Sequence, residues 1–210
     1  MATLPVITIS RQYGSGGRQI GQAIAETLGI PYYDNELIVL AAQESGFDKK
    51  MFEDADKAAY SSLLFSLSMY GGSGGNFSMP LPDRVYLIQS DLIRKLAQQG
   101  PCVIVGRCAD YILRKDAARL AVFLRAPQED RVRRAVEEYG DAPEAAADKV
   151  AKTDKKRSVY YAHYTGERWG DGANYDLLLN TSALGIDGAV QLVCDAARLA
   201  AKQAEGAPLV

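Results

Sequence analysis

The residues best suited to chemistry in this chain are glycines and arginines that follow a predicted strand. A β-branched run, Val6 to Ser10, is followed by Arg11-Gln12-Tyr13-Gly14-Ser15-Gly16-Gly17-Arg18-Gln19. Three glycines within four positions let backbone N–H groups converge on a small anion. A helix with an apolar face from Ile20 to Leu28 follows, and a helix N-terminus also favours negative charge. The stretch therefore predicts a phosphate-binding loop; a glycine-rich turn that only joins a strand to a helix is the alternative.

The loop departs from the usual phosphate-loop pattern at its end. That pattern closes with Gly-Lys-Ser/Thr, in which the lysine reaches the β and γ phosphates and the hydroxyl holds Mg²⁺. Here Gly16 is followed by Gly17 and Arg18. If a nucleotide binds, Arg18 is the cation expected to replace the lysine, and Ser10 or Ser15 would have to supply any hydroxyl.

Charged residues also follow the other predicted strands. Asp34 ends a short second strand, Gly106-Arg107 follows the apolar run 102–105, and Arg125 follows the run 120–124. Open α/β sheets bind ligands at the carboxyl ends of their strands, so we expect these residues along one edge. A helix cap or turn is an equally open interpretation of Asp34.

Two arginine-rich segments lie in the second half of the chain. Arg131 and Arg134 are three apart on a predicted helix, so both could reach one phosphate chain as a lid closes; a solvated face with local ion pairs is the alternative. Asp154 and Arg157 lie in a cationic, tyrosine-containing stretch suited to contact with phosphate and base. His163, the only histidine, is expected to be a packed residue, although a general base is conceivable.

Strands and helices alternate about five times along the chain. This pattern predicts an α/β fold, a three-layer parallel sheet of about five strands with helices on both faces. The expected strands are 6–10, 30–34, 102–105, 120–124 and 175–180. We expect one domain over residues 1–210, with a mobile substrate-side arm at about 47–82 and a lid at about 125–170. A disordered connector and a homodimer contact remain alternatives for the arm.

Composition excludes several partners. The 210 residues carry a net charge of -2, which argues against nucleic acid or an anionic membrane as a partner. Three cysteines without metal-ligand spacing indicate a reducing compartment, no disulfide framework and no metal site built from cysteines. No apolar stretch reaches membrane-spanning length, so we expect a cytoplasmic protein.

Several of these stretches together resemble the cytidylate kinase-like family. They are the opening Ile7 to Arg18, the stretch Val103 to Arg107, the region Phe123 to Arg134 and the ending Asp176 to Ser182. The resemblance runs from Val6 to about Leu199. It implies a P-loop nucleoside monophosphate kinase fold with a lid, and transfer of the ATP γ-phosphate to CMP, dCMP or a related small acceptor. The implied cofactors are ATP and Mg²⁺, and the implied partners are small-molecule nucleotides.

The resemblance also implies roles for individual residues. The residues expected to bind ATP are Arg11, Gly14, Ser15, Gly16, Gly17, Arg18 and Gln19. The residues expected to bind the acceptor are Asp34, Arg107, Asp154 and Arg157, and the expected catalytic residues are Arg18, Arg107, Arg131 and Arg134. Phosphoryl transfer needs position and positive charge more than a general base. The sequence lacks the loop lysine and the two acids of the family around Gly106-Arg107, and Asp110 is a candidate replacement for one of them. A catalytically weak nucleotide-binding regulator of the same fold therefore stays open as the alternative function.

Overall fold

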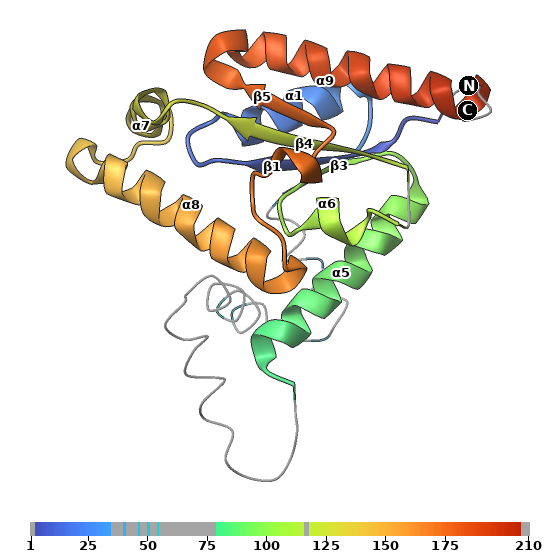
Figure 1. Ribbon diagram of the computed structural model, residues 1–210, viewed down its shortest axis with the longest axis horizontal. Helices are drawn as coiled ribbons and strands as arrows, with labels where there is room; N and C mark the ends of the chain where they lie inside the picture. Colours follow the sequence, from blue (N-terminus) through green and yellow to red (C-terminus); the bar gives the residue numbers. More distant parts are fainter. Residues whose placement is uncertain are drawn as a thin grey trace.

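The computed structural model describes residues 3–34, 40, 46, 50, 54, 79–115 and 118–206. Within these residues, five strands form one sheet in the order β2-β3-β1-β4-β5, and every paired neighbour is parallel (Figure 1). The strands are β1 Val6–Arg11, β2 Tyr32–Tyr33, β3 Val103–Val105, β4 Arg119–Arg125 and β5 Leu177–Asn180. The predicted parallel sheet of about five strands is confirmed.

Helices cover both faces of this sheet. They are α1 Gly17–Leu28, α5 Leu81–Gln99, α6 Ala109–Ile112, α7 Gln128–Glu137, α8 Pro143–Thr165 and α9 Thr181–Gly206, and a 3₁₀ turn, η1, covers Gly172–Asn174. Helix α9 begins at Thr181 with a helical turn that precedes a kink at Gly185. In Figure 1, α1 and α9 lie above the sheet, whereas α5 and α6 lie below it.

The core consists of two apolar layers, one on each face. Ile7 and Ile9 of β1 point into the layer beneath α1 and α9, together with Val103 and Val105 of β3. Ile104 points the other way, into the layer formed with α5, α6 and the end of α8. Each such side chain contributes about 1.5–3 kcal/mol when fully buried. A strand that is buried on both faces has no polar alternation, which explains the unbroken apolar runs in the sequence.

The sheet topology brings four chain segments to one edge. Since all strands run the same way, their carboxyl ends coincide, with β1 central between β3 and β4. The segments that leave these ends are the glycine-rich loop after β1, Asp34 after β2, Gly106 and Arg107 after β3, and the α7–α8 segment after β4. The expected edge therefore exists in the fold.

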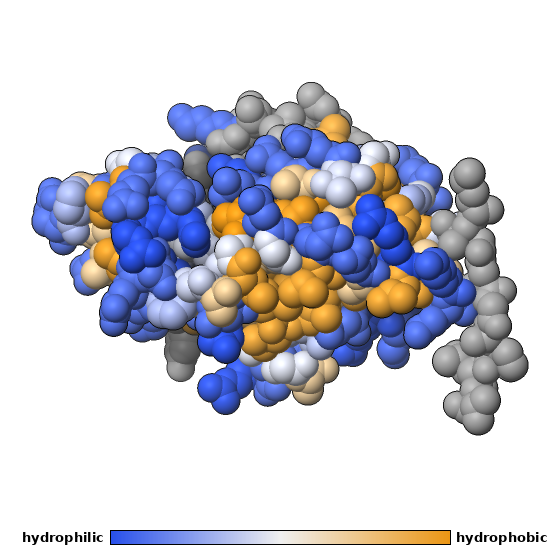
Figure 2. All heavy atoms as spheres, turned by 90° about the horizontal axis from the view of Figure 1, so that it is seen from above, coloured by the Kyte–Doolittle hydropathy of each residue, from blue (hydrophilic) through white to orange (hydrophobic). Residues whose placement is uncertain are grey.

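The α7–α8 segment occupies the place of the predicted lid, and its movement as a lid stays a prediction. The predicted arm at about 47–82 lies outside the described residues except at 50, 54 and 79–82. On the α9 side of the molecule, an apolar area interrupts a hydrophilic surface (Figure 2), and Leu184, Leu192 and Leu199 of α9 are exposed. None of the described helices is both long and apolar enough to span a bilayer. A homodimer stays a prediction.

Candidate functional site

The glycine-rich loop forms a tight turn between β1 and α1. Both the backbone N–H and the hydroxyl of Ser15 donate to the carbonyl oxygen of Gln12, at 3.3 and 2.9 Å. Gly14 and Gly16 have φ values of 80° and 78°, a region that favours glycine. Gly16 immediately precedes α1 and has no side chain to cap the first N–H groups of the helix. The loop thus has the strand, turn and helix N-terminus of a phosphate-binding site.

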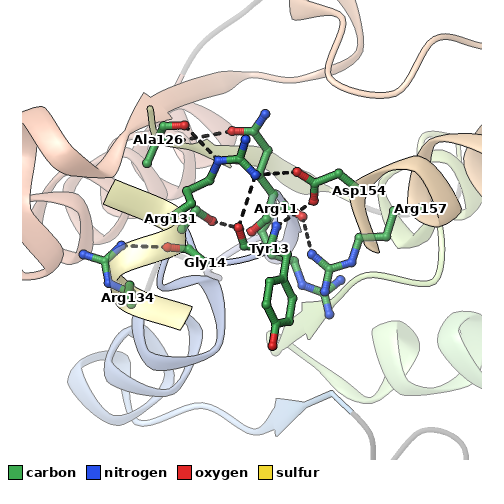
Figure 3. Close-up of polar contacts among 10 residues, drawn as sticks. Arg11, Tyr13, Gly14, Ala126, Arg131, Arg134, Asp154 and Arg157 are labelled. Atoms are coloured by element: carbon green, nitrogen blue, oxygen red, sulfur yellow. Dashed lines mark hydrogen bonds and ion pairs between the residues drawn. The ribbon is translucent and has the colours of Figure 1, made fainter. Parts of the chain in front are cut away.

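Helix α7 packs directly against this loop and holds its carbonyl groups (Figure 3). Arg134 donates from Nη1 to the Gly14 carbonyl oxygen at 2.9 Å. Arg131 donates from Nη1 to the Tyr13 carbonyl oxygen at 3.3 Å and from Nε to the Ala126 carbonyl oxygen at 3.0 Å. Arg131 is buried, with 8% of its surface exposed. It is therefore not a residue of a solvated face, which was the alternative considered from the sequence.

Helix α8 contacts the same loop through Asp154 and Arg157. Asp154 accepts the Tyr13 N–H through Oδ1 at 2.7 Å, and its Oδ2 lies 2.5 Å from Nη1 of Arg131. Arg157 donates to the carbonyl oxygen of Arg11 at 2.8 Å. Both helices of the predicted lid are thus joined to the loop by charged side chains that reach backbone groups.

A second cluster of charges lies beyond the end of β2. Asp34 is buried, and one of its oxygens accepts a hydrogen bond from Nε of Arg18 at 2.9 Å. Its other oxygen lies 3.6 Å from Nη2 of Arg11. The structure therefore brings Asp34, Arg11 and Arg18 together, as expected if they serve one site.

The turn after β3 has an unusual backbone. Arg107 and Cys108 have φ values of 58° and 54°, which are uncommon for residues other than glycine. Such conformations cost of the order of 1–3 kcal/mol each and are concentrated at functional sites. The Gly106 N–H donates to the Ile9 carbonyl oxygen at 3.0 Å, and the Ala109 N–H donates to the Gly106 carbonyl oxygen at 3.1 Å. These two hydrogen bonds hold the turn in place. The strained turn makes Arg107 a strong candidate for ligand contact.

Two cavities meet at this edge of the sheet. The first, which we call the loop cavity, measures about 530 Å³ and is lined by Gly14, Gly17, Arg18, Gln19, Tyr139 and Lys149 among others. The second, the strand-end cavity, measures about 360 Å³ and is lined by Arg107, Thr153, Lys156, Tyr160, Tyr161 and Trp169 among others. Arg11, Asp34 and Arg157 line both cavities. Two anionic ligands could therefore lie next to each other with cations between them.

Asp110 is a buried carboxyl group bonded to two residues that line the strand-end cavity. It accepts hydrogen bonds from the Ser10 hydroxyl at 3.3 Å and from the Tyr161 hydroxyl at 2.7 Å. Burial raises the pKa of Asp110 above its usual value, because the charged form loses its water. The Ser10 hydroxyl thus has a carboxyl partner on α6, a contact between residues 100 positions apart.

The sequence-predicted residues do not all reach the cavities. Arg11, Gly14, Gly17, Arg18, Gln19, Asp34, Arg107 and Arg157 line them, whereas Arg131, Arg134 and Asp154 contact the loop from outside. Ser15 and Gly16 are buried within the turn itself. The ring of His163 lies against that of Tyr164, with the centroids 4.6 Å apart, and lines neither cavity, but His163 is an exposed residue and not the packed one that was expected.

Sequence reasoning missed Tyr139 and Lys149, which line the loop cavity. Lys156 and Tyr160 line the strand-end cavity and belong to the cationic, tyrosine-containing stretch that was expected to contact phosphate and base, although neither residue was singled out. Among the described residues, no three His, Cys, Asp or Glu side chains form a cluster that could hold a metal ion.

A parallel α/β sheet, a glycine-rich loop before a helix, and arginine-rich helices beside that loop define a phosphoryl-transfer enzyme of the P-loop kinase class. Solved structures show the same fold: a gluconokinase from Sinorhizobium meliloti superposes with a TM-score of 0.55 at 15% identity, covering 98% of each chain. An uncharacterized protein from Eubacterium ventriosum superposes with a TM-score of 0.69 at 25% identity, covering 92% of this chain and 98% of the other.

The sequence comparison identifies the family. The profile of the cytidylate kinase-like family matches residues 6–183, and this chain belongs to that family. A cytidylate kinase from Pyrobaculum aerophilum is 28% identical over 191 residues, covering 90% of this chain and 91% of the relative. A cytidylate kinase from Methanopyrus kandleri is 27% identical, covering 84% of each chain. The predicted enzyme class, an ATP-dependent phosphotransferase, is confirmed.

Proposed function

We propose that this protein is a nucleoside monophosphate kinase that transfers the γ-phosphate of ATP to CMP or dCMP. The observation that carries the proposal is the pair of adjoining cavities that share Arg11, Asp34 and Arg157 at the end of the glycine-rich loop. One phosphate-binding loop with one cavity would suit a hydrolase equally well; two adjoining cationic cavities suit a donor and an acceptor. The names of the Pyrobaculum and Methanopyrus relatives support cytidylate as the acceptor.

In this proposal the loop cavity holds ATP and the strand-end cavity holds the monophosphate. The N–H groups of Gly14 and of residues 16–19 bind the donor phosphates, and Arg18 contacts them from the entrance of the cavity. Arg107 and Arg157 bind the acceptor phosphate as charge-assisted donors. We assign Asp154 to positioning, since its two oxygens are engaged by Tyr13 and Arg131.

The transfer itself follows from this placement. An oxygen of the acceptor phosphate attacks the γ-phosphorus of ATP, the bond from that phosphorus to the β–γ bridging oxygen breaks, and ADP leaves with the electron pair. The acceptor phosphate is already ionised near pH 7, so no general base has to remove a proton. Arginines around the moving group stabilise its charge, and the closed lid excludes water.

Mg²⁺ is the expected companion of ATP in this reaction. The hydroxyl that usually ligates it is replaced by Arg18, and Asp34 is the buried carboxylate that lines both cavities. Mg²⁺ commonly keeps several waters and takes one or two carboxylates besides the substrate phosphates. Both oxygens of Asp34 already face guanidinium groups, one that of Arg18 and the other that of Arg11. The residues present therefore fit an ion held chiefly by ATP and water. When bound, the ion neutralises charge on the β and γ phosphates.

A catalytically weak nucleotide-binding regulator is the second candidate, and the observation that favours it is Gly17 in the place of the usual lysine. Product analysis separates the two. Purified protein is incubated with ATP and Mg²⁺ and with CMP, dCMP, UMP, AMP or GMP in turn.

Selective formation of CDP or dCDP, lost in Arg107→Ala and retained in Arg133→Ala, supports the kinase. Arg133 is the matched control because it lies on the exposed side of α7, where it pairs with Asp130. ATP binding without a diphosphate product from any acceptor supports the regulator.

A further inference from the structure

The side chain of Arg11 follows a path that two glycines keep open. Arg11 is the last residue of β1, and a Cβ atom placed on Gly17 would lie 2.6 Å from its Cγ and 2.8 Å from its Cβ. A Cβ atom on Gly106 would lie 2.3 Å from Nη1 of Arg11. Real Cβ atoms do not approach other atoms so closely. Arg11 therefore passes the first residue of α1 and ends at the turn after β3, in space that side chains at 17 and 106 would fill.

The positions of Arg11 and Gly17 match two defined places in the phosphate-loop pattern. That pattern reads Gly, four residues of any type, Gly, Lys and then Ser or Thr. With Gly16 as its second glycine, Arg11 stands at the first glycine and Gly17 stands at the lysine. The chain thus has a cation where the pattern has glycine, and a glycine where the pattern has its cation. A lysine side chain at position 17 and the Arg11 side chain would need the same space. The arginine at position 11 and the glycine at position 17 therefore depend on each other.

The guanidinium of Arg11 lies where a transferring phosphate would pass. It is close to Asp34, with Nη2 3.6 Å from Oδ1, and Arg11 lines both the loop cavity and the strand-end cavity. Its backbone is fixed as well, since its carbonyl accepts from Arg157 (Figure 3). Arg18, the residue expected from the sequence to replace the lysine, leaves 62% of its side chain exposed, compared with 20% for Arg11. A less exposed cation between donor and acceptor has the stronger electrostatic effect.

We propose that Arg11 is the cation of this phosphate loop and does the work of the missing lysine. It contacts the β and γ phosphates of ATP from the β1 side of the loop and stays with the γ-phosphoryl group as that group moves toward the acceptor. Arg18 binds the donor at the rim, and Asp34 holds the Arg11 guanidinium in place. This assignment rests on the proposed kinase function, and it makes Gly17 and Gly106 requirements of the Arg11 path.

The test exchanges the two positions. The variants are Arg11→Gln, Arg11→Lys, Gly17→Lys and the double variant Arg11→Gly/Gly17→Lys, with Arg133→Gln as the matched control on an exposed arginine. Calorimetric titration measures the affinities for ATP and for adenosine, and a coupled assay with CMP measures transfer. Adenosine lacks phosphates, so its affinity reports whether the nucleoside part of the site is intact.

We expect Arg11→Gln to weaken ATP binding by about tenfold or more without changing adenosine binding. Transfer should fall by roughly 10²–10³-fold, as when one transition-state donor is removed. Gly17→Lys should also lose transfer, because the introduced lysine side chain and Arg11 need the same space. The double variant restores the first glycine and the lysine of the conventional pattern, so its transfer rate should exceed that of Arg11→Gln by about tenfold or more. The rate of Arg11→Lys should lie between those of Arg11→Gln and the wild type.

Two results would overturn the proposal. One is an ATP affinity and a transfer rate of Arg11→Gln that stay within about threefold of the wild type. The other is a folded double variant whose transfer rate does not exceed that of Arg11→Gln. Unfolding midpoints identify variants that have lost the fold; if the double variant is one of them, the comparison of Arg11→Gln with Arg11→Lys decides. The measurement of ATP affinity needs no acceptor. If the wild type binds ATP but phosphorylates no monophosphate, the proposed function fails while the ATP affinity of Arg11→Gln still decides the role of Arg11.

Discussion

Replacing Arg131 with methionine should destabilise the protein far more than a surface arginine would. Arg131 is buried and bonds the carbonyl oxygens of Tyr13 and Ala126 and the carboxylate of Asp154. Methionine keeps most of the side-chain volume, so the change removes the charge and the hydrogen bonds rather than opening a large cavity. What remains is a carboxylate that has lost its ion-pair partner, while Arg157 still acts on it electrostatically.

The size of the effect follows from the burial of the pair. Breaking a buried ion pair by removing one partner costs about 3–5 kcal/mol. Asp154 keeps its bond from the Tyr13 N–H and 16% of its side-chain surface is exposed, which places the expected loss near the lower limit, about 3 kcal/mol. In a chain of this length each kcal/mol shifts the unfolding midpoint by about 2–4 °C, so we expect a fall of about 6–12 °C.

A double-mutant cycle with Asp154→Asn isolates the pair. Urea unfolding of the wild type, Arg131→Met, Asp154→Asn and the double variant should give a coupling energy of about 1.5–3 kcal/mol. The control is Arg133→Met on the same helix, where the arginine pairs with Asp130 at the surface; its loss should stay below about 1 kcal/mol. A loss below about 1 kcal/mol for Arg131→Met, with no coupling to Asp154, would refute the view that this pair fixes the lid to the loop.

Three further measurements test the site. Gly14→Ala should lower the free energy of unfolding in urea by more than about 2 kcal/mol, because the φ of Gly14 is 80° and the new Cβ would lie 2.3 Å from an α7 carbonyl oxygen. The control Gly29→Ala should lower it less, because Gly29 has a φ of 65° but no atom lies within 4 Å of the new Cβ. Burial raises the pKa of Asp110, so the folded state keeps this proton to higher pH than the unfolded chain, and its contribution to stability falls as pH rises through that interval. Asp110→Asn should therefore gain stability relative to wild type from about pH 4 upward in thermal scans, whereas an advantage that grows toward acid pH would contradict the burial argument. Burial also raises the pKa of the Cys102 thiol to about 11 and that of Cys108 well above its usual value; thiol labelling at pH 8 should proceed only as fast as the protein opens, and rapid labelling before unfolding would show that these thiols are accessible.

The sheet could be predicted from the sequence because its strands are buried on both faces. Val103 to Val105 is apolar throughout, and the β-branched run at Val6 ends abruptly at the loop, so composition alone located both strands. The alternation with helices then required parallel pairing and right-handed crossovers. Element ends were less predictable: β2 has only two residues, and α9 continues through a kink at Gly185.

The contacts within the site could not be read from local sequence. Tyr13 and Asp154 are 141 positions apart, and their hydrogen bond depends on how α8 crosses the loop. From the sequence, Arg131 was expected to reach phosphate. The spacing of residues on a helix predicts which side chains share a face, but it does not predict which groups those side chains contact. Arg18 was expected to replace the lysine because it follows Gly17 directly in the chain. The path of the Arg11 side chain, in contrast, depends on Gly106 in a distant turn.

Arg131 and Arg134 of α7 bear on anion binding through the geometry of the peptide bond. In a trans peptide the carbonyl of one residue and the N–H of the next point in opposite directions. The Tyr13 carbonyl is directed at Arg131, so the Gly14 N–H is directed away from α7, and Gly14 lines the loop cavity. Arg131 thus orients a donor that it never touches. If the lid moves during turnover, its bonds to Tyr13 and Gly14 link that movement to the shape of the phosphate loop. The geometry of the loop then depends on the position of the lid. A variant that loosens the lid should therefore weaken phosphate binding even when every residue of the loop is unchanged.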